Sequence, residues 1–184
     1  MSKKFIFIHI PRNAGTSVTR ALRPFGSQDS FKNHVSALKF SSTIGLSVFR
    51  SVFSFAIVRN PWDRQVSLYS YIRQDPSHSL HQVLKSCSFK EYIRRITSLG
   101  KAVNRTQKSF VYSEEKLLVN FVGRFENLEK DFQTVCIKIG VTASLPKINV
   151  SSHESYQKYY NDETIEIVND VFKQDIFTFG YACE

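Results

Sequence analysis

The chain has 184 residues and carries 25 Lys and Arg against 16 Asp and Glu, a formal net charge of +9. Hydrophobic residues make up 42% of it and aromatic residues 14%, which is too apolar for a disordered protein. Its seven glycines and five prolines exclude collagen-like and linker-like sequence. Because domains commonly hold about 150 residues, we expect a single domain over residues 1–184.

The cysteine pattern and the hydropathy narrow the class further. Cys87, Cys136 and Cys183 form no CxxC pair, which argues against a thiolate zinc site and against a disulfide framework. No apolar run approaches the roughly 20 residues of a membrane span. The apolar part of the N-terminus is also too short for a signal peptide. We therefore expect a soluble, cytoplasmic protein with reduced thiols.

The charge is unevenly distributed along the chain. Residues 1–110 hold 18 Lys and Arg and 4 Asp and Glu, a net charge of +14, whereas residues 111–184 carry −5. This asymmetry indicates that the first part faces an anionic ligand. Nucleic acid, an acidic membrane surface, an acidic polysaccharide and a nucleotide all fit it. No basic run reaches five residues and no zinc-finger, RRM or KH pattern occurs, which weakens the case for nucleic acid.

The first half of the chain reads as alternating strands and helices, which predicts an α/β fold. Residues 4–10 form a short apolar run that ends at Pro11, typical of a strand buried in a parallel sheet. A helix is expected over residues 16–22. Residues 54–58 predict a second buried strand, and residues 61–74 predict an amphipathic helix with proline in its first turn.

The second half continues this pattern less regularly. Ser88 and Glu91 form a capping box, which predicts a helix start. Residues 75–110 hold seven basic and two acidic residues and show the least pattern, so we expect an excursion from the core. A solvated basic surface and a wall that binds a ligand explain that segment equally well. The periodicity of apolar residues predicts three further elements: a strand over 117–123 and helices over 125–139 and 162–173.

Residues 10–17, Ile-Pro-Arg-Asn-Ala-Gly-Thr-Ser, follow the first strand, where α/β folds commonly bind phosphate. Backbone N–H groups at a helix N-terminus point at an anion, and the helix dipole favours negative charge there. A well-capped helix without a ligand fits the same spacing. The segment does not match a Walker A loop, because no lysine follows Gly15 and no glycine lies five residues before it. A magnesium-dependent ATPase or kinase is therefore disfavoured.

The second motif, Val-Arg-Asn-Pro-Trp-Asp-Arg-Gln-Val-Ser-Leu-Tyr over residues 58–69, places Arg59 at the carboxyl end of the second strand. Ser67 lies two turns into the helix that follows. In a parallel sheet, ligands bind beyond the carboxyl ends of the strands. Arg59 and the loop over residues 11–17 would then bind two anionic groups of one ligand.

These motifs resemble those of a known family. FIHIPRNAGTS is similar to the 5′-phosphosulfate loop of the carbohydrate-type (type 2) sulfotransferases, written HIPKTAGTS, and FAIVRNPWDRQVSLY resembles their 3′-phosphate motif. LLVNFVGRFENLEKDF and YYNDETIEIVNDVFKQDIFTFGY resemble two later blocks. The four motifs occur in order over nearly the whole chain. The relatives include heparan and chondroitin 2-O-type enzymes and small bacterial members.

The resemblance implies a three-layer α/β/α fold with a central, mainly parallel sheet, like that of P-loop NTPases. It implies transfer of a sulfuryl group from 3′-phosphoadenosine 5′-phosphosulfate (PAPS) to a hydroxyl, with release of adenosine 3′,5′-bisphosphate (PAP) and without a metal. We expect a glycan or a small sugar as the acceptor. Neither a nucleic-acid partner nor a membrane span is expected.

The resemblance also assigns roles to individual residues. Arg59 and Ser67 would hold the 3′-phosphate, and a loop over residues 147–153 would close the donor site. His34, in an HxxA-like segment, would be the catalytic base, whereas His9 is expected to be structural. Arg12 would place a positive charge at the leaving oxygen. The 5′-phosphosulfate would be held by residues of the first loop: Arg12, Asn13, Ala14, Gly15, Thr16 and Ser17.

Two positions depart from the family pattern, because the usual lysine of the first loop is Arg12 here and the threonine after it is Asn13. Arginine keeps the charge and can bind two oxygens, but it does not readily give up a proton. One alternative is therefore a catalytically weakened module that binds PAP or PAPS. A protein that binds polyanions or nucleic acid is a further alternative.

Overall fold

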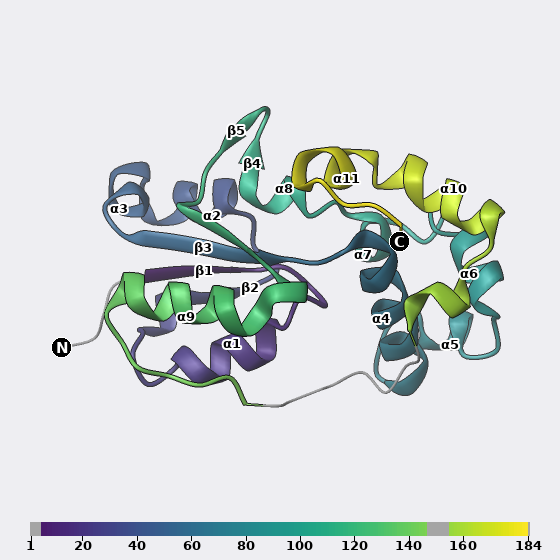
Figure 1. Cartoon of the computed structure of the whole chain (residues 1–184), viewed down its shortest axis with the longest axis horizontal. Coiled ribbons are helices and arrows are strands. Elements are labelled where there is room, and N and C mark those ends of the chain that lie inside the picture. Colours follow the sequence, from purple (N-terminus) through teal and green to yellow (C-terminus); the bar gives the residue numbers. More distant parts are fainter. Residues whose placement is uncertain (1–4, 147–154, 184) are drawn as a thin grey trace. The chain divides into compact units, whose positions relative to one another are not determined.

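A computed structural model describes residues 5–146 and 155–183, and its contacts divide the chain into two compact units. Unit 1 comprises Met1–Arg59 and Gln107–Asn149, and unit 2 comprises Asn60–Thr106 and Val150–Glu184. Each unit is thus assembled from two separate stretches of chain, as the colours in Figure 1 make visible. This division does not test whether the units fold independently, so the single domain over 1–184 stays a prediction.

Unit 1 is built on a parallel four-stranded sheet in the order β2-β1-β3-β6. The chain passes from β1 outward to β2 and then returns across β1 to β3. This reversal makes the carboxyl ends of β1 and β3 a topological switch point, where open α/β sheets bind their ligands. The four strands are β1 (Phe5–His9), β2 (Phe31–Asn33), β3 (Phe53–Val58) and β6 (Phe121–Arg124).

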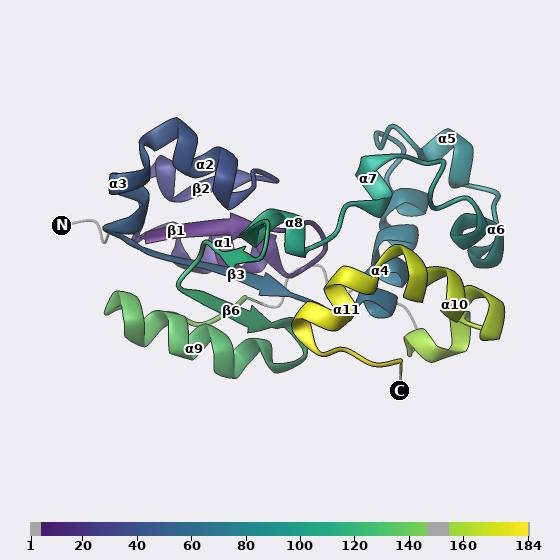
Figure 2. The same ribbon diagram turned by 90° about the horizontal axis from the view of Figure 1, so that it is seen from above.

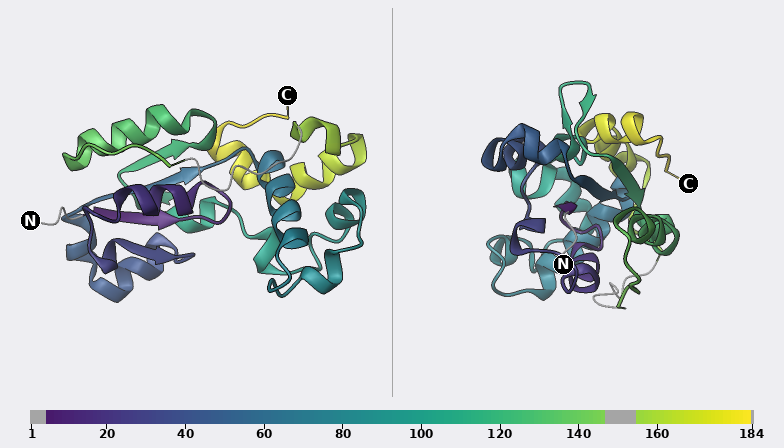
Figure 3. Two further views of the ribbon diagram at one scale, coloured as in Figure 1. Left: turned by 90° about the horizontal axis from the view of Figure 1, so that it is seen from below. Right: turned by 90° about the vertical axis from the view of Figure 1, so that its left-hand side faces the viewer.

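Helices cover both faces of this sheet. In Figure 1, α1 and α9 lie below β1 and β3, whereas α2 and α3 lie above them; Figure 3, seen from below, shows the purple helix α1 in front of β1. Alternate residues of β1 and β3 form a core with α1 and α9, in which Phe7, Phe55 and Phe132 are buried. The three-layer α/β/α prediction is confirmed. The helices of unit 1 are α1 (Gly15–Leu22), α2 (Ala37–Ile44), α3 (Leu46–Arg50), α8 (Lys108–Val111) and α9 (Leu128–Ile139), with 3-10 turns at Gln28–Ser30 and Phe125–Asn127.

Unit 2 is helical in the part of it that the structure describes, and it is viewed from above in Figure 2. Its longest helix, α4 (Pro61–Gln74), starts as its sequence predicts, because the Asn60 side chain caps the N–H groups of Trp62 and Asp63. The other elements of unit 2 are α5 (His81–Leu84), α6 (Phe89–Arg94), α7 (Lys101–Asn104), a 3-10 turn (Tyr156–Tyr159), α10 (Asp162–Val171) and α11 (Lys173–Phe179).

Residues 75–106 are packed into unit 2. The buried side chains of Leu84, Phe89, Tyr92 and Val103 join Trp62 in its core. The capping box that starts α6 is present, since Ser88 Oγ accepts from the N–H of Glu91 and the Glu91 carboxylate accepts from the N–H of Ser88. The acceptor role of this segment stays a prediction.

Two sequence-based expectations about elements need correction, and one strand was not expected at all. The strand expected over 117–123 is wrong in extent, because Leu117 belongs to an antiparallel hairpin of β4 (Tyr112–Ser113) and β5 (Lys116–Leu117), and β6 starts at Phe121. The helix expected over 162–173 breaks at Phe172, where the backbone leaves the helical region (φ −109°, ψ 20°). Strand β2 has only three residues, too few for a periodic pattern, and was not expected.

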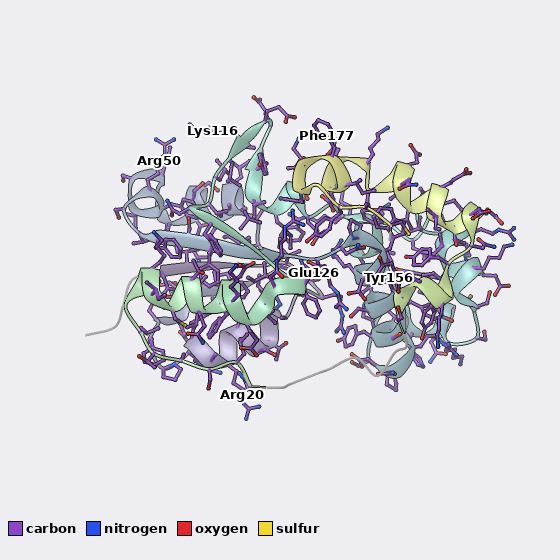
Figure 4. All side chains as sticks on the ribbon, viewed as in Figure 1. Arg20, Arg50, Lys116, Glu126, Tyr156 and Phe177 are labelled. Atoms are coloured by element: carbon purple, nitrogen blue, oxygen red, sulfur yellow. The ribbon has the colours of Figure 1, made fainter. Side chains whose placement is uncertain are left out.

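The two units differ sharply in charge. Unit 1 holds 15 Lys and Arg against 6 Asp and Glu, and unit 2 holds 10 of each, so unit 1 carries the whole formal charge of +9. Figure 4 shows three of these basic side chains, Arg20, Arg50 and Lys116, extending outward from α1, α3 and β5. The anionic ligand that the sequence indicates is therefore expected on unit 1.

Candidate functional site

All four strands of the sheet end at one edge of unit 1, and each is followed by a loop or a side chain that could contact a ligand. The loop over residues 10–14 follows β1, His34 follows β2, Arg59 follows β3 and Phe125 follows β6. Because the strands are parallel, their carboxyl ends lie along the same edge of the sheet. The structure therefore brings the predicted Arg12, His34 and Arg59 to one edge, and it adds Phe125.

The loop after β1 has an unusual backbone. Arg12 and Ala14 both adopt left-handed conformations, with φ of 68° and 58°. This region costs a residue with a side chain about 1–2 kcal/mol. Ala14 is also the N-cap of α1 and offers no side-chain cap. A backbone that alternates into the left-handed region next to a helix N-terminus turns its N–H groups toward a common point, which suits an anion.

A buried pair of amide side chains holds this loop against β3. Asn13 Nδ2 donates to the carbonyl oxygen of Ile57 (2.8 Å) and to Gln107 Oε1 (2.6 Å). Gln107 is itself fully buried and bonds to both backbone groups of Arg59: Oε1 accepts from its N–H (2.9 Å), and Nε2 donates to its C=O (2.8 Å). The Asn13 side chain therefore anchors the loop to the protein interior. Only the backbone of Asn13 remains available to contact a ligand.

Arg59 is tied to the same loop by its side chain. Its Nη1 donates to the carbonyl oxygen of Arg12 at 3.1 Å. Its guanidinium carbon lies 3.9 Å from the ring centroid of Phe125, a close cation–π contact. Arg59 is only 4% exposed, so its charge is largely removed from water and fixed in position. A buried, oriented guanidinium next to a loop whose backbone conformation suits an anion is well placed to hold a phosphate.

Two histidines lie beside this loop. His9 Nδ1 lies 2.9 Å from Asn33 Oδ1, and because an amide oxygen can only accept, Nδ1 carries the hydrogen and Nε2 the lone pair. The ring centroids of His9 and His34 are 5.1 Å apart. Burial lowers the pKa of His9, the charge of His34 lowers it further, and the bond to Asn33 partly offsets both. His9 therefore tends to stay neutral at neutral pH, while the exposed His34 ring is the more accessible base.

Gly15, the first residue of α1, is required by His9. A Cβ atom at Gly15 would lie 1.8 Å from His9 Nε2, far inside any allowed contact. The glycine thus admits the imidazole ring against the start of the helix. The His9 ring therefore packs against the start of α1, while its expected structural role stays a prediction.

The amino-acid sequence matches a known protein family over almost its whole length. The model of the Sulfotransferase family matches residues 1–182, nearly the entire chain. The chain belongs to the sulfotransferase family. An uncharacterized protein of Archaeoglobus fulgidus is 32% identical to this sulfotransferase over 117 residues, which cover 62% of this chain and 91% of the relative.

The fold of this sulfotransferase also has a solved counterpart. The crystal structure of the mouse sulfotransferase SULT7A1 complexed with PAP matches it with a TM-score of 0.61 at 13% identity, covering 95% of this chain and 84% of that chain. At that identity the likeness shows the fold alone. The family match confirms the prediction of a PAPS-dependent sulfotransferase at the level of the family.

One of the predicted site residues, Ser67, does not belong to unit 1. Ser67 is fully buried on α4 and belongs to unit 2, so its role toward the 3′-phosphate stays a prediction. Within the loop and α1, Thr16 is exposed and Ser17 is buried. The loop over residues 147–153 lies outside the described residues. Among the described residues, no group of three or more His, Cys, Asp or Glu is placed to hold a metal ion.

Sequence reasoning missed two residues of the sulfotransferase site. Gln107 lies 48 positions after Arg59, and no local pattern marks so distant a contact. Phe125 lies in one of the family motifs, but the sequence predicted it only as the first residue of a helix. Its contact with Arg59 was not predicted. The described parts of the chain, residues 5–146 and 155–183, include no helix that is long and apolar enough to cross a membrane.

Proposed function

We propose that this sulfotransferase moves a sulfuryl group from PAPS to a hydroxyl group of a saccharide, as a soluble cytoplasmic enzyme. The observation that carries the proposal is the left-handed loop over Arg12–Ala14 at the N-terminus of α1, with the buried Arg59 bonded to its backbone. PAPS carries two anionic groups at opposite ends of a ribose, and unit 1 offers two adjacent cationic or N–H-rich positions. Its net charge of +9 suits a donor with about four negative charges.

Donor binding would divide between the two positions. The backbone N–H groups of Asn13–Ser17, together with Arg12, would hold the 5′-phosphosulfate. Arg59 and Ser67 would hold the 3′-phosphate. Because Asn13 Nδ2 donates its two hydrogens to Ile57 and Gln107, Asn13 would bind PAPS through its backbone N–H.

The transfer step follows from these positions. The acceptor hydroxyl oxygen forms a bond to sulfur while the bond from sulfur to the 5′-phosphate oxygen breaks, and the electron pair of that bond stays on the phosphate of PAP. Arg12 stabilises the charge that grows on this oxygen. His34 accepts the proton of the hydroxyl, which an imidazole can do near neutral pH.

The acceptor is the least constrained part of the proposal. Of the seven basic residues in 75–110, Lys90 and Arg94 pair with Glu163, and Lys108 pairs with Glu115. Three of the seven are thus paired with two of the protein's own carboxylates. An acidic or sulfated sugar bound by Lys90, Arg94 or Lys108 would therefore compete with these carboxylates.

Transfer of ³⁵S-labelled sulfate from PAPS to a panel of glycans and small alcohols tests the function. His34→Ala should abolish transfer and leave the affinity for PAP unchanged, because the base acts on the acceptor and not on the donor. His78→Ala, a histidine of unit 2, is the matched control and should transfer at the wild-type rate. Full activity in His34→Ala would remove His34 from the role of base.

A second candidate function rests on Arg12. Because arginine holds its proton in place of the family's lysine, a module that binds PAP or PAPS without turning it over is the alternative. Tight PAP binding without transfer to any member of the acceptor panel would favour it. Binding that falls steeply with salt and is not competed by PAP would instead indicate a polyanion-binding protein.

A further inference from the structure

Gln107 occupies a position that the proposed chemistry does not use. The chain leaves unit 1 after Arg59 and re-enters it at Gln107, so these two residues are the ends of the stretch that belongs to unit 2. The Gln107 amide bonds to both backbone groups of Arg59, as a neighbouring strand would. The same amide accepts from Asn13 in the loop after β1. One side chain thus connects the two segments proposed to hold the donor.

The hydrogen bonds fix the orientation of this amide. Gln107 Oε1 accepts from two donors, and Nε2 donates to a carbonyl oxygen. Rotating the amide by half a turn would set donor against donor and acceptor against acceptor at all three contacts. The Asn13 amide is fixed in the same way, since its Nδ2 faces two acceptors. Asn13 Oδ1 is buried and accepts no hydrogen bond, a cost that the two donor bonds must offset.

The loop needs such support. Arg12 and Ala14 hold backbone conformations that residues with side chains avoid, and such conformations persist only where the surroundings enforce them. Asn13 lies between these two residues and is anchored to Ile57 and Gln107. A threonine, usual here in the family, has a shorter side chain with one hydroxyl and could not make both bonds. The departure at Asn13 therefore strengthens the link between the loop and Arg59.

We propose that Gln107 is a positioning residue for donor binding, which rests on the proposed function. It fixes the position of the loop over Arg12–Ala14 relative to the backbone of Arg59. The distance between these two segments then matches the distance between the 5′ and 3′ groups of one nucleotide. Gln107 itself does not touch the donor. It acts on the 5′ side through Asn13 and on the 3′ side through Arg59.

Calorimetric titration with PAP, adenosine 5′-monophosphate and adenosine 3′-monophosphate tests this. Gln107→Met keeps the volume and removes the three hydrogen bonds. It should weaken PAP binding at least tenfold, or about 1.4 kcal/mol, and weaken both monophosphates. Asn13→Thr should weaken only the 5′-monophosphate. The loss of affinity for the 5′-monophosphate in the double variant should be smaller than the sum of the two single losses, because both changes remove the bond between Asn13 and Gln107.

A matched control separates positioning from general stability. Val135→Ala removes two methyl groups from the buried face of α9 and should lower the melting temperature without changing any of the three affinities. Wild-type protein that binds no PAP would refute the proposed function itself. Wild-type protein that binds PAP, together with a Gln107→Met variant of equal affinity, would refute the positioning role alone.

The test does not depend on the folding of a single variant. If Gln107→Met does not fold, Asn13→Thr still tests the 5′ side of the link, which runs through Asn13. A loss of threefold or more for the 5′-monophosphate, with none for the 3′-monophosphate, supports the link. Equal affinities for both ligands in Asn13→Thr and in the wild type would overturn it.

Discussion

Replacing Gly15 by alanine tests the shape of the loop most sharply. The backbone at Gly15 lies outside the left-handed region, so alanine meets no conformational barrier there. At a helical position alanine is in general favoured over glycine by about 1 kcal/mol. Any destabilisation must therefore come from the contact of the new methyl group with His9.

The size of the effect follows from the geometry. The added Cβ would lie 1.8 Å from His9 Nε2 and 2.0 Å from Cδ2, whereas ordinary contacts are 3.4–4 Å, so the ring must move aside. That movement breaks the 2.9 Å hydrogen bond to Asn33. Overpacking and the lost hydrogen bond together cost about 2–4 kcal/mol. In a protein of this size this corresponds to a fall in melting temperature of roughly 5–15 °C.

The decisive assay is a double-mutant cycle with His9→Ala, measured by urea unfolding at neutral pH. Without the imidazole ring, Gly15→Ala should become neutral or stabilising, so the sign of its effect reverses. Two results would refute the reasoning: a loss below about 0.5 kcal/mol in the wild-type background, which is the usual scatter of harmless substitutions, or an equal loss in both backgrounds.

Three further predictions concern charge at the same edge of the sheet. Because burial lowers the pKa of His9 below its ordinary 6.5, the stability that neutral His9 contributes is complete above that pH and is lost as the pH falls through the lowered value. Urea midpoints at pH 7.5 and 5.0 should therefore differ less in His9→Gln than in the wild type, and an unchanged difference would contradict the assignment. Phe125→Leu removes the ring under Arg59, a contact worth about 0.5–2 kcal/mol, so calorimetry should show PAP bound about twofold to thirtyfold more weakly, while Phe125→Tyr binds normally. Arg12→Lys should change kcat for sulfate transfer by less than tenfold, since both side chains are cations; a gain of tenfold or more would mark the natural enzyme as catalytically weakened.

The elements with strong local patterns were predictable from the sequence. The apolar runs at β1 and β3 are buried on both faces of the sheet, so nothing but an interior strand explains them. Helix α4 carries its own start signals in Asn60 and Pro61, and α9 ends at Gly140, which adopts the left-handed conformation that terminates helices. In each case the physical cause lies within a few residues of the element itself.

The remaining features depend on contacts between distant parts of the chain. Residue Asn120 illustrates this: its N–H and its Oδ1 bond to the backbone of Ser54, 66 positions away, and β6 begins only after it. The apolar run from Leu117 therefore does not form one strand, although its hydropathy suggests so. Gln107 could not be predicted for the same reason, because a lone glutamine forms no periodic pattern and its partners, Asn13 and Arg59, lie in the segments that follow β1 and β3.

The candidate site was predicted in outline and refined by the structure. The positions of Arg12 and Arg59 at one sheet edge followed from the order of strand and loop. His34 came only from the family resemblance, because the short strand β2 before it was not expected. Asn13 was assigned to the donor, but its side chain is directed into the protein toward Ile57 and Gln107. Only the folded chain shows which of a loop's polar groups are already used by the protein.

The central claim is that the carboxyl edge of this sheet binds the two anionic groups of one nucleotide. Thermal unfolding with PAP, compared with ATP and with adenosine 5′-monophosphate, tests it most directly. At a hundred times its dissociation constant PAP should stabilise the protein by about 2.7 kcal/mol, and at equal concentration both other nucleotides should raise the melting temperature less. Equal stabilisation by ATP and PAP, or none by PAP at millimolar concentration, would contradict the claim.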